Sequence, residues 1–310
     1  MSSRVDPLDP AIAALRDGAR GSGAAALVDL TPEEARERVS GGDAACAAGP
    51  PVDHVEDLLV PTATQASPIR VRRYEHGAPH ATLVYAHGGG WVTGDLEYAD
   101  ELCRFLAARA GLRVLSVEYR RAPEHRCPAA VDDVDRCLAW AAEQHRDLPL
   151  FVGGDSAGGN LAAVVAQRRR DLVTGLVAVY PVLDHDTTRD SYREQQDGFP
   201  IGARDMAWFF DHYTDPDQRS DPRVSPLRGV RAGHPPTYLL TAGHDPLRDE
   251  GFAYADALRA LGVPLRHDHE PALCHGFLRT TGPSDGARAA RDRLVEAVAG
   301  FVRDQTSVQQ

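Results

Sequence analysis

The stretch GGDSAGGN, residues 153–160, lies between the apolar run LPLFV and the alanine-rich run LAAVVAQRRR. An apolar run that ends in glycines predicts a β-strand, and the alanine-rich run predicts a helix. The glycine-rich turn therefore joins a strand to a helix. Amides at a helix start have no intrahelical acceptor and favour negative charge, so such a turn can bind a phosphate or hold a nucleophile.

The residues within the turn exclude the phosphate interpretation. A P-loop needs Lys and then Ser or Thr after its second glycine, but Gly159 and Asn160 stand there, and the chain contains no lysine. The dinucleotide pattern G-x-G-x-x-G fails because Asp155 and Ser156 occupy the position of its second glycine in the two possible registers. The pattern that fits is G-x-S-x-G at 154–158, which presents Ser156 on a sharp strand-to-helix turn.

A serine nucleophile needs a base and an acid that orients the base, and with this turn the chain order is Ser, then Asp or Glu, then His. Asp245 follows the predicted strand PTYLLTAG, and His275 follows the next one, VPLRHDHEP. Asp249 and Glu250 compete for the role of the acid, but they lie in the first turn of a predicted helix, where acidic residues suit the helix dipole. We therefore predict Ser156, Asp245 and His275 as the catalytic residues.

A second glycine-rich loop, HGGGW at 87–91, also follows a predicted strand. Glycines in this position allow backbone amides to turn toward a substrate oxygen, which is the oxyanion-loop pattern of lipases and esterases. Gly89 is the donor that the pattern favours most, followed by Gly88 and Gly90. The amide of Ala157 at the helix start is the fourth predicted donor.

Charge and cysteine content exclude several classes of partner. The 310 residues include 34 basic and 45 acidic side chains, a net charge of −11 that is spread along the chain, which argues against nucleic acid or an anionic membrane as a partner. The five cysteines form no CxxC pair, and their odd number excludes a complete disulfide framework. The N-terminus lacks the apolar core of a signal peptide, and no apolar run is long enough to span a membrane, so we expect a cytoplasmic protein.

No metal or organic cofactor is expected from the sequence. His267 and His269 alternate on one predicted strand near Cys274, but no standard zinc spacing is completed. We interpret the two histidines as exposed polar residues of an edge strand.

The remaining pattern predicts an α/β architecture. Strands are expected in 69–75, 81–90, 112–120, 148–154, 175–181, 236–243 and 263–271. Helices are expected at 31–41, 128–144 and 291–302, the first of them with a capping box formed by Thr31 and Glu34. Apolar strands that alternate with helices indicate a mostly parallel sheet with helices on both faces.

Two regions do not fit this alternation. Residues 1–55 read as mostly helical before any strand begins, and residues 184–232 form a long insertion that carries aromatic side chains. We predict a single domain over 1–310, with a cap built from about 1–50 and 184–232. The catalytic core would then comprise about 55–183 and 233–305.

The ordered motifs HGGGW, YRRAPEHRCPAAVDD, GDSAGG, DPRVSPL, HDPLRDEG and CHGF resemble those of the hormone-sensitive-lipase-like group of α/β-hydrolase carboxylesterases. The match runs from about residue 55 to the C-terminus. The resemblance implies the α/β-hydrolase fold with a helical cap and the roles assigned above. It also implies that Trp91, Asp155 and the cap residues Trp208, Phe209 and Tyr213 contact the substrate.

The expected reaction is hydrolysis of short- to medium-chain carboxylic esters through an acyl-enzyme intermediate. Two alternatives remain open at this point: a small-molecule binding protein without hydrolytic activity, and a lyase or dehydratase on the same scaffold. A homodimer is also possible, and the sequence does not define the acyl length, the alcohol or the stereochemical preference.

Overall fold

The computed structural model describes residues 5–41, 45–62 and 67–307. Eight strands of these residues form one sheet, in the order β1-β2-β4-β3-β5-β6-β7-β8. They are β1 (His54–Val60), β2 (Ile69–Glu75), β3 (Ala81–Ala86), β4 (Leu112–Val117), β5 (Leu150–Asp155), β6 (Gly175–Val179), β7 (Thr237–His244) and β8 (Leu265–Cys274). β1 and β2 pair antiparallel, β2 runs antiparallel to β4, and all later pairs are parallel.

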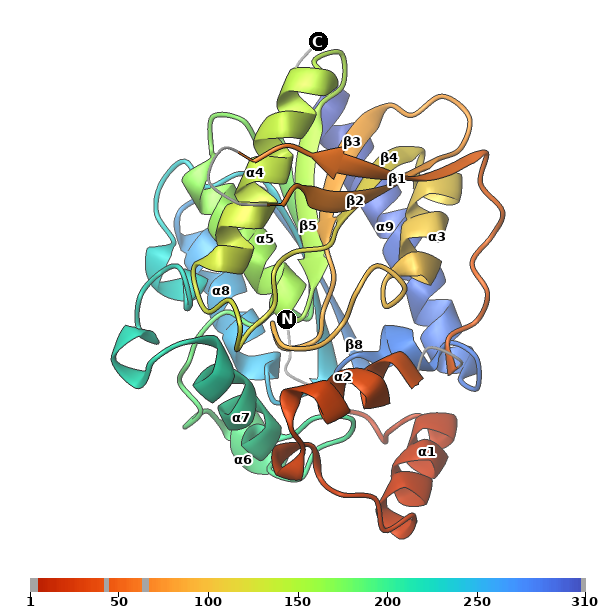
Figure 1. The fold of residues 1–310 in the computed structure, drawn as a ribbon, viewed down its shortest axis with the longest axis vertical. Helices are drawn as coiled ribbons and strands as arrows, with labels where there is room; N and C mark the ends of the chain where they lie inside the picture. The colour runs from red at the N-terminus through yellow and green to blue at the C-terminus, as the bar shows by residue number, and fades with distance from the viewer. Residues whose placement is uncertain (1–4, 42–44, 63–66, 308–310) are drawn as a thin grey trace.

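Helices cover both faces of the sheet (Figure 1), as the alternating pattern predicts. One face carries α3 (Asp100–Ala110) and α9 (Asp285–Ser307), and the other carries α4 (Ala129–Gln144), α5 (Ala157–Arg168) and α8 (Arg248–Ala260). The mostly parallel α/β-hydrolase sheet expected from the sequence is therefore confirmed. β1 was not predicted, because its residues alternate poorly and six of its seven are not buried.

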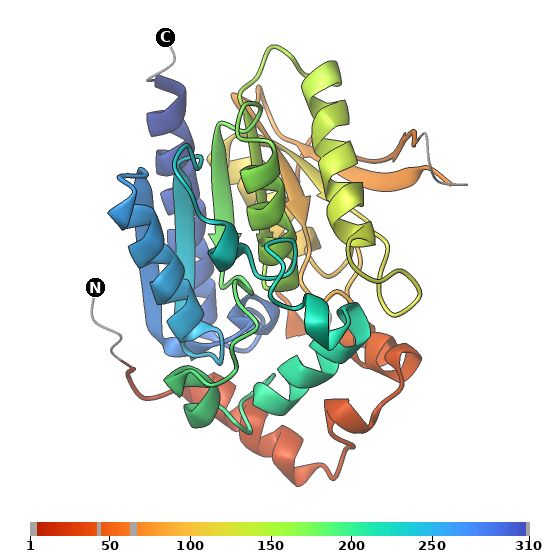
Figure 2. The same ribbon diagram turned by 90° about the vertical axis from the view of Figure 1, so that its left-hand side faces the viewer.

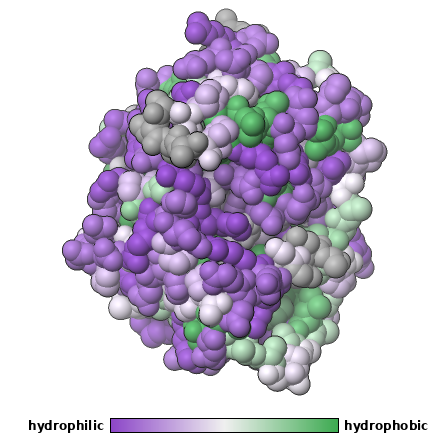
Figure 3. Space-filling view, in the orientation of Figure 1, coloured by the Kyte–Doolittle hydropathy of each residue, from purple (hydrophilic) through white to green (hydrophobic). Residues whose placement is uncertain are grey.

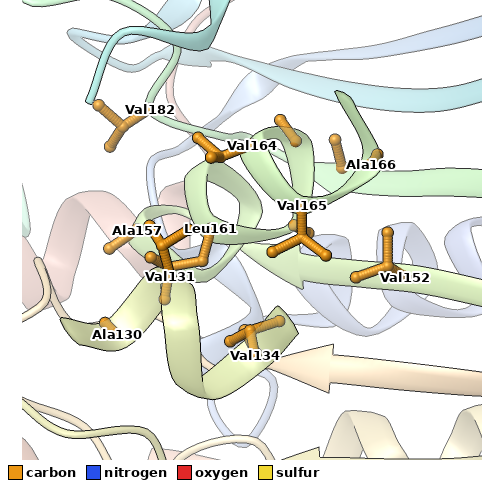
Figure 4. Packing of buried hydrophobic residues seen from close by; sticks show 14 of the residues in the cluster. Ala130, Val131, Val134, Val152, Ala157, Leu161, Val164, Val165, Ala166 and Val182 are labelled. Carbon is orange, nitrogen blue, oxygen red and sulfur yellow. The ribbon is translucent and has the colours of Figure 1, made fainter. Parts of the chain in front are cut away.

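Each face of the sheet has its own apolar core. In Figure 4, Val131 and Val134 of α4 lie beside Leu161 and Val165 of α5, next to Val152 of β5. Full burial of one such side chain contributes about 1.5–3 kcal/mol. The face of the molecule in Figure 3 is mostly hydrophilic, with apolar side chains in small separate groups.

The remaining helices gather at the carboxyl end of the parallel strands (Figures 1 and 2). They come from the N-terminal segment, residues 5–50, and from the insertion, residues 184–232. The segment contains α1 (Pro10–Gly21), η1 (Leu27–Asp29) and α2 (Pro32–Gly41), and the insertion contains α6 (Asp190–Glu194), α7 (Ala203–Tyr213) and η3 (Pro216–Gln218). The last helix of the insertion, η4 (Pro226–Gly229), lies instead against α5, where Gln167 Nε2 donates to the carbonyl of Pro226. The capping box at the start of α2 is present, since the amide of Glu34 donates to Thr31 Oγ1 and the amide of Thr31 donates to Glu34 Oε2.

A buried polar network ties the N-terminal segment to the core. Arg291 of α9 forms an ion pair with Glu101 of α3, and the two residues are 5% and 8% exposed. Thr281, which follows η5 (Phe277–Thr280), donates its hydroxyl to Glu101 and accepts the amide of Ala47. The network therefore links two helices of one face to the chain that enters the sheet from the N-terminal segment.

We expect Arg291→Met to lower the free energy of unfolding by about 3–5 kcal/mol, because it leaves the buried carboxylate of Glu101 without its partner. The matched control is Arg293→Met on the same helix, where the arginine side chain is 57% exposed in its ion pair with Glu270. Loss of such an exposed pair costs about 1 kcal/mol or less. Urea unfolding measures both variants, and equal midpoints would contradict the role given to the buried pair.

Candidate active site

The turn after β5 holds Ser156 in a strained backbone conformation, with φ 54° and ψ −119°. Such angles cost about 1–3 kcal/mol for a residue other than glycine. The neighbouring glycines allow the turn to approach the end of β3: a Cβ atom at Gly158 would lie 2.0 Å from the carbonyl oxygen of Ala86, and one at Gly154 would lie 2.4 Å from the same atom. Small residues on both sides of Ser156 are therefore a steric requirement of this packing.

The three predicted catalytic residues come together at the carboxyl edge of the sheet. The distance from Ser156 Oγ to His275 Nε2 is 2.9 Å, and the distance from His275 Nδ1 to Asp245 Oδ2 is also 2.9 Å. With the proton on Nδ1, the ring donates to Asp245 and accepts the serine hydroxyl. Ser156 and His275 are each 5% exposed, and Asp245 is 1% exposed, so the relay lies in a site almost free of bulk water.

The two competing acids are engaged elsewhere. Asp249 accepts the amide of Ser191, and Glu250 accepts the amide of Leu183, which anchors the start of the insertion. Burial raises the pKa of Glu250 well above its usual value. Asp245 is held by the amide of Leu247 at 2.8 Å, and this bond leaves its Oδ2 for His275.

The loop after β3 lies against the nucleophile turn. Within the described chain, no residue accepts the amides of Gly89, Gly90 or Ala157, so these three remain available to an oxyanion. The amide of Gly88 instead donates to Asp155 Oδ1 at 3.0 Å. The prediction of Gly88 as an oxyanion donor is therefore wrong for this conformation, because its N–H is already bonded.

Two side chains behind the loop hold its carbonyl groups, and sequence reasoning did not identify either. His87 Nδ1 lies 2.8 Å from the carbonyl oxygen of Gly88, and Tyr119 donates its hydroxyl to the carbonyl of His87 at 2.8 Å. Burial lowers the pKa of His87 to about 4, so its ring is neutral near pH 7. Tyr119 opens the block YRRAPEH, and its position within that block is the only sequence signal for this role.

The carboxylate of Asp155, which the sequence predicts to contact the substrate, lies in the interior and is bonded to neighbouring groups. Its carboxylate is 3% exposed and accepts the hydroxyl of Tyr85 at 2.8 Å in addition to the amide of Gly88. Burial raises the pKa of Asp155 to about 6. The residue before the nucleophile therefore braces the oxyanion loop from the interior.

The predicted pocket aromatics have different positions. Trp91 and Tyr213 are fully buried and stack on each other, with ring centroids 4.2 Å apart and an interplanar angle of 3°. They join α7 to the core, and their contact with a substrate stays a prediction. Phe209 contacts the oxyanion loop directly, since a Cβ atom at Gly90 would lie 2.1 Å from its ring. Trp208 is half-buried and packs edge to face on Phe209.

A cleft of about 340 Å³ lies between the two parts of the molecule that cover the sheet edge. Arg16 and Arg20 of the N-terminal segment, Phe199 of the insertion and His244 of the core are among its lining residues. The carbonyl of His244 accepts the amide of His275 at 3.1 Å. The cleft therefore lies beside the loop that carries the base.

His267 and His269 are arranged around Thr241 Oγ1, at 3.0 and 2.9 Å. β8 is an edge strand as expected, but His267 is 6% exposed, and its burial lowers its pKa to about 4. The expectation of two exposed histidines is wrong for His267 and is not met by the half-buried His269, because Phe252 of α8 packs against both rings. Across the described residues, no group of three His, Cys, Asp or Glu side chains could hold a metal ion.

Four cysteines of the described chain, Cys103, Cys127, Cys137 and Cys274, are free thiols, and all of them except Cys127 are buried. No helix in the described ranges combines the length and the apolar character needed to cross a lipid bilayer.

Comparison with known proteins places this geometry in a family. Residues 83–279 match the Abhydrolase_3 family model, described as alpha/beta hydrolase fold. The chain is 41% identical over 276 residues to carboxylic ester hydrolase LipN of Mycobacterium tuberculosis, and this alignment covers 82% of this chain and 73% of LipN. It is 37% identical over 262 residues to ethyl acetate hydrolase of Pseudomonas putida, covering 79% of this chain and 82% of that protein.

Solved structures agree with these relatives. An esterase from Pyrobaculum calidifontis superposes with a TM-score of 0.84 at 33% identity, over 95% of this chain and 99% of that one. LAE6, an alpha/beta hydrolase enzyme from the metagenome of Lake Arreo, superposes with a TM-score of 0.87 at 33% identity, over 96% and 99% of the two chains. The chain therefore belongs to the hormone-sensitive-lipase-like family of α/β hydrolases and is a hydrolase.

Proposed function

We propose that this protein is a serine carboxylesterase that hydrolyses short- to medium-chain esters through an acyl-enzyme intermediate. The observation that carries the proposal is the hydrogen-bonded series Ser156, His275, Asp245 next to three backbone amides without acceptors. The two alternatives are a binding protein on the same scaffold, which needs no hydrogen-bonded Ser–His–Asp series, and a lyase. The names of LipN and of the ethyl acetate hydrolase support the esterase.

In the first half-reaction, Ser156 Oγ attacks the ester carbonyl while His275 Nε2 takes the hydroxyl proton. The C–O bond to the alcohol then breaks, and His275 returns the proton to the leaving alkoxide. Asp245 keeps the proton of the neutral ring on Nδ1 and stabilises the imidazolium that forms. The donors for the tetrahedral oxyanion are the amides of Gly89, Gly90 and Ala157.

In the second half-reaction, a water molecule replaces the alcohol. His275 takes a proton from the water as its oxygen attacks the acyl carbonyl, and the proton then passes to Ser156 Oγ as the acyl–enzyme bond breaks. The carboxylic acid leaves and the free serine is restored. Every step uses groups of the chain together with water.

The preference for short acyl chains is supported by the walls above the nucleophile. Phe209 packs directly on Gly90, and Pro200 lies near Gly276, where a Cβ atom would be 3.8 Å from its Cγ. Both walls belong to the insertion, and they leave Ser156 and His275 almost fully covered. We propose that the segments from about 1–50 and 184–232 form the cap over a core of about 55–183 and 233–305. We also propose that the protein is cytoplasmic, in keeping with the free thiols of Cys103, Cys127, Cys137 and Cys274.

We expect Ser156→Ala to reduce kcat for p-nitrophenyl acetate by about 10³-fold or more while the protein stays folded, because the variant lacks the nucleophile. The measurements are steady-state hydrolysis and circular dichroism. A fluorophosphonate ester should label the wild-type protein once and leave the variant unlabelled. A wild-type protein that resists the phosphonate and hydrolyses no ester would favour the binding protein or the lyase.

The ring of Phe209 should set the acyl length. In a series of p-nitrophenyl esters, we expect the wild-type protein to hydrolyse the short chains, from acetate to butyrate, with a higher kcat/KM than decanoate. Phe209→Ala should raise kcat/KM for the longer chains by about 10-fold, because each methylene that enters an apolar site contributes about 0.8 kcal/mol. Trp208→Ala is the matched control on the same helix and should leave the profile in place. An unchanged profile for Phe209→Ala would contradict this assignment.

A further inference from the structure

Arg36 of α2 connects the N-terminal segment to the loop that carries the predicted oxyanion donors. Its Nε donates to the carbonyl of Val92 at 2.9 Å, and its Nη2 donates to the carbonyl of Ala122 at 2.9 Å. The same guanidinium binds Glu124 through both carboxylate oxygens, at 2.8 and 2.6 Å. One side chain of the N-terminal segment thus satisfies two backbone carbonyls of the core.

The bond to Val92 reaches the donor Gly90 through one further hydrogen bond. The carbonyl of Val92 shares a peptide plane with the amide of Thr93, and this amide donates to the carbonyl of Gly89 at 2.8 Å. The Thr93 hydroxyl, at 2.9 Å, and the amide of Val92, at 3.1 Å, donate to the same carbonyl. The carbonyl of Gly89 and the amide of Gly90 belong to one planar peptide group, so fixing the carbonyl also fixes the direction of the N–H. Arg36 therefore supports the turn that aims the amide of Gly90.

The contact with Ala122 supports the same turn from a second side. The amide of Ala122 donates to the carbonyl of Trp91 at 2.9 Å, next to Val92 in the chain. Arg36 therefore binds two backbone segments, at Val92 and at Ala122, that are also hydrogen-bonded to each other.

The other donor of the loop is held without the N-terminal segment. The amide of Gly89 shares a peptide plane with the carbonyl of Gly88, which is bound by the buried ring of His87. The orientation of Gly89 thus depends on the core alone, whereas the orientation of Gly90 depends in part on a contact from α2.

The ion pair with Glu124 orients the guanidinium of Arg36, whereas the contacts with the two carbonyls hold the backbone. Glu124 is 47% exposed, so the pair itself contributes little to stability. The hydrogen bond from Arg36 lowers the pKa of Glu124 to about 2, so the carboxylate stays charged throughout the pH range of an esterase assay. A bidentate carboxylate fixes the plane of the guanidinium, and this plane directs its remaining N–H groups at the two carbonyls.

We propose that Arg36 is a positioning residue for catalysis: by binding the carbonyls of Val92 and Ala122 from the N-terminal segment, it holds the amide of Gly90 in the oxyanion-binding direction. The inference rests on the proposed esterase activity. It implies that the oxyanion site is complete only while α2 is docked on the core, so displacement of the N-terminal segment lowers catalysis even where the relay of Ser156 and His275 is intact.

The test compares Arg36→Ala with Arg38→Ala, a control on the same helix whose guanidinium binds the carbonyl of Ala25 within the N-terminal segment. The substrate is p-nitrophenyl acetate, the inhibitor is a trifluoromethyl ketone that forms a tetrahedral adduct, and the assay temperature lies well below the melting temperature of every variant. For Arg36→Ala we expect kcat to fall by about 10–100-fold with little change in KM, less than the 10²–10³-fold loss that follows removal of a whole oxyanion donor. The ketone should bind more weakly by a similar factor.

Glu124→Gln separates the ion pair from the carbonyl contacts. The side-chain amide still accepts one N–H of Arg36 but no longer holds the guanidinium through two oxygens, so we expect the melting temperature to fall slightly and kcat to fall by less than in Arg36→Ala. A role of Arg36 in stability alone predicts a lower melting temperature for Arg36→Ala with full kcat, and that result would overturn the inference.

If Arg36→Ala does not fold, Arg36→Lys serves the same purpose. An ammonium group retains the charge for Glu124 but cannot direct a rigid fork at two carbonyls and a carboxylate at once, so kcat should still fall. Full kcat for Arg36→Lys would contradict the proposal. A wild-type protein that neither hydrolyses the ester nor reacts with a phosphonate would refute the esterase activity itself, which is a different outcome from an active wild type with an equally active Arg36 variant.

Discussion

The close packing of the turn at Ser156 against the end of β3 is the constraint on which the rest of the site depends. The turn adopts a positive φ at a serine and approaches the carbonyl of Ala86 more closely than any side chain at Gly154 or Gly158 would permit. The HGGGW loop begins directly after Ala86, so this contact fixes the distance between Ser156 and the proposed oxyanion donors of that loop. The cost of the backbone strain, about 1–3 kcal/mol, is offset by the buried strands and helix on either side of the turn.

The sheet delivers the remaining groups to the same edge because β5, β7 and β8 are parallel. A buried carboxylate, a histidine and a serine then meet with a minimum of exposed surface. In a site with so little water, charge interactions are much stronger than in bulk solvent. Stabilisation of an oxyanion there depends mainly on how each backbone N–H is oriented. Both the N-terminal segment and the insertion take part in this shielding, and both contact the oxyanion loop, through Arg36 and Phe209.

Much of the fold follows from local pattern. Seven of the eight strands overlap the predicted ranges, because buried parallel strands read as apolar runs ended by glycine or proline. The ends are less well predicted, since β5, β7 and β8 continue past their ranges to Asp155, His244 and Cys274. β1 was missed because an edge strand with one solvated face has no such run. The positions of Ser156, Asp245 and His275 were accessible from motif order alone.

The contacts that support these three residues could not be predicted from the order of the motifs. Gly88 and Asp155 lie in the expected motifs, but whether an amide faces a substrate or a neighbouring carboxylate depends on the packing of two distant segments. Trp91 and Tyr213 read as pocket aromatics, and only the stacking of α7 on the core shows them to be interior residues. The link from Arg36 to Val92 spans 56 positions and carries no local signal.

The hydrogen bond between the amide of Gly88 and the carboxylate of Asp155 has a further consequence for the family's history. It couples the two glycine-rich motifs, since the buried amide of Gly88 loses its acceptor when residue 155 is not an acid. A chimaera that received the HGGGW loop of a distant relative would need the compatible acid and the Tyr85 hydroxyl beside it. Recombination between such hydrolases should therefore tolerate crossovers in the cap far more readily than crossovers between β3 and β5.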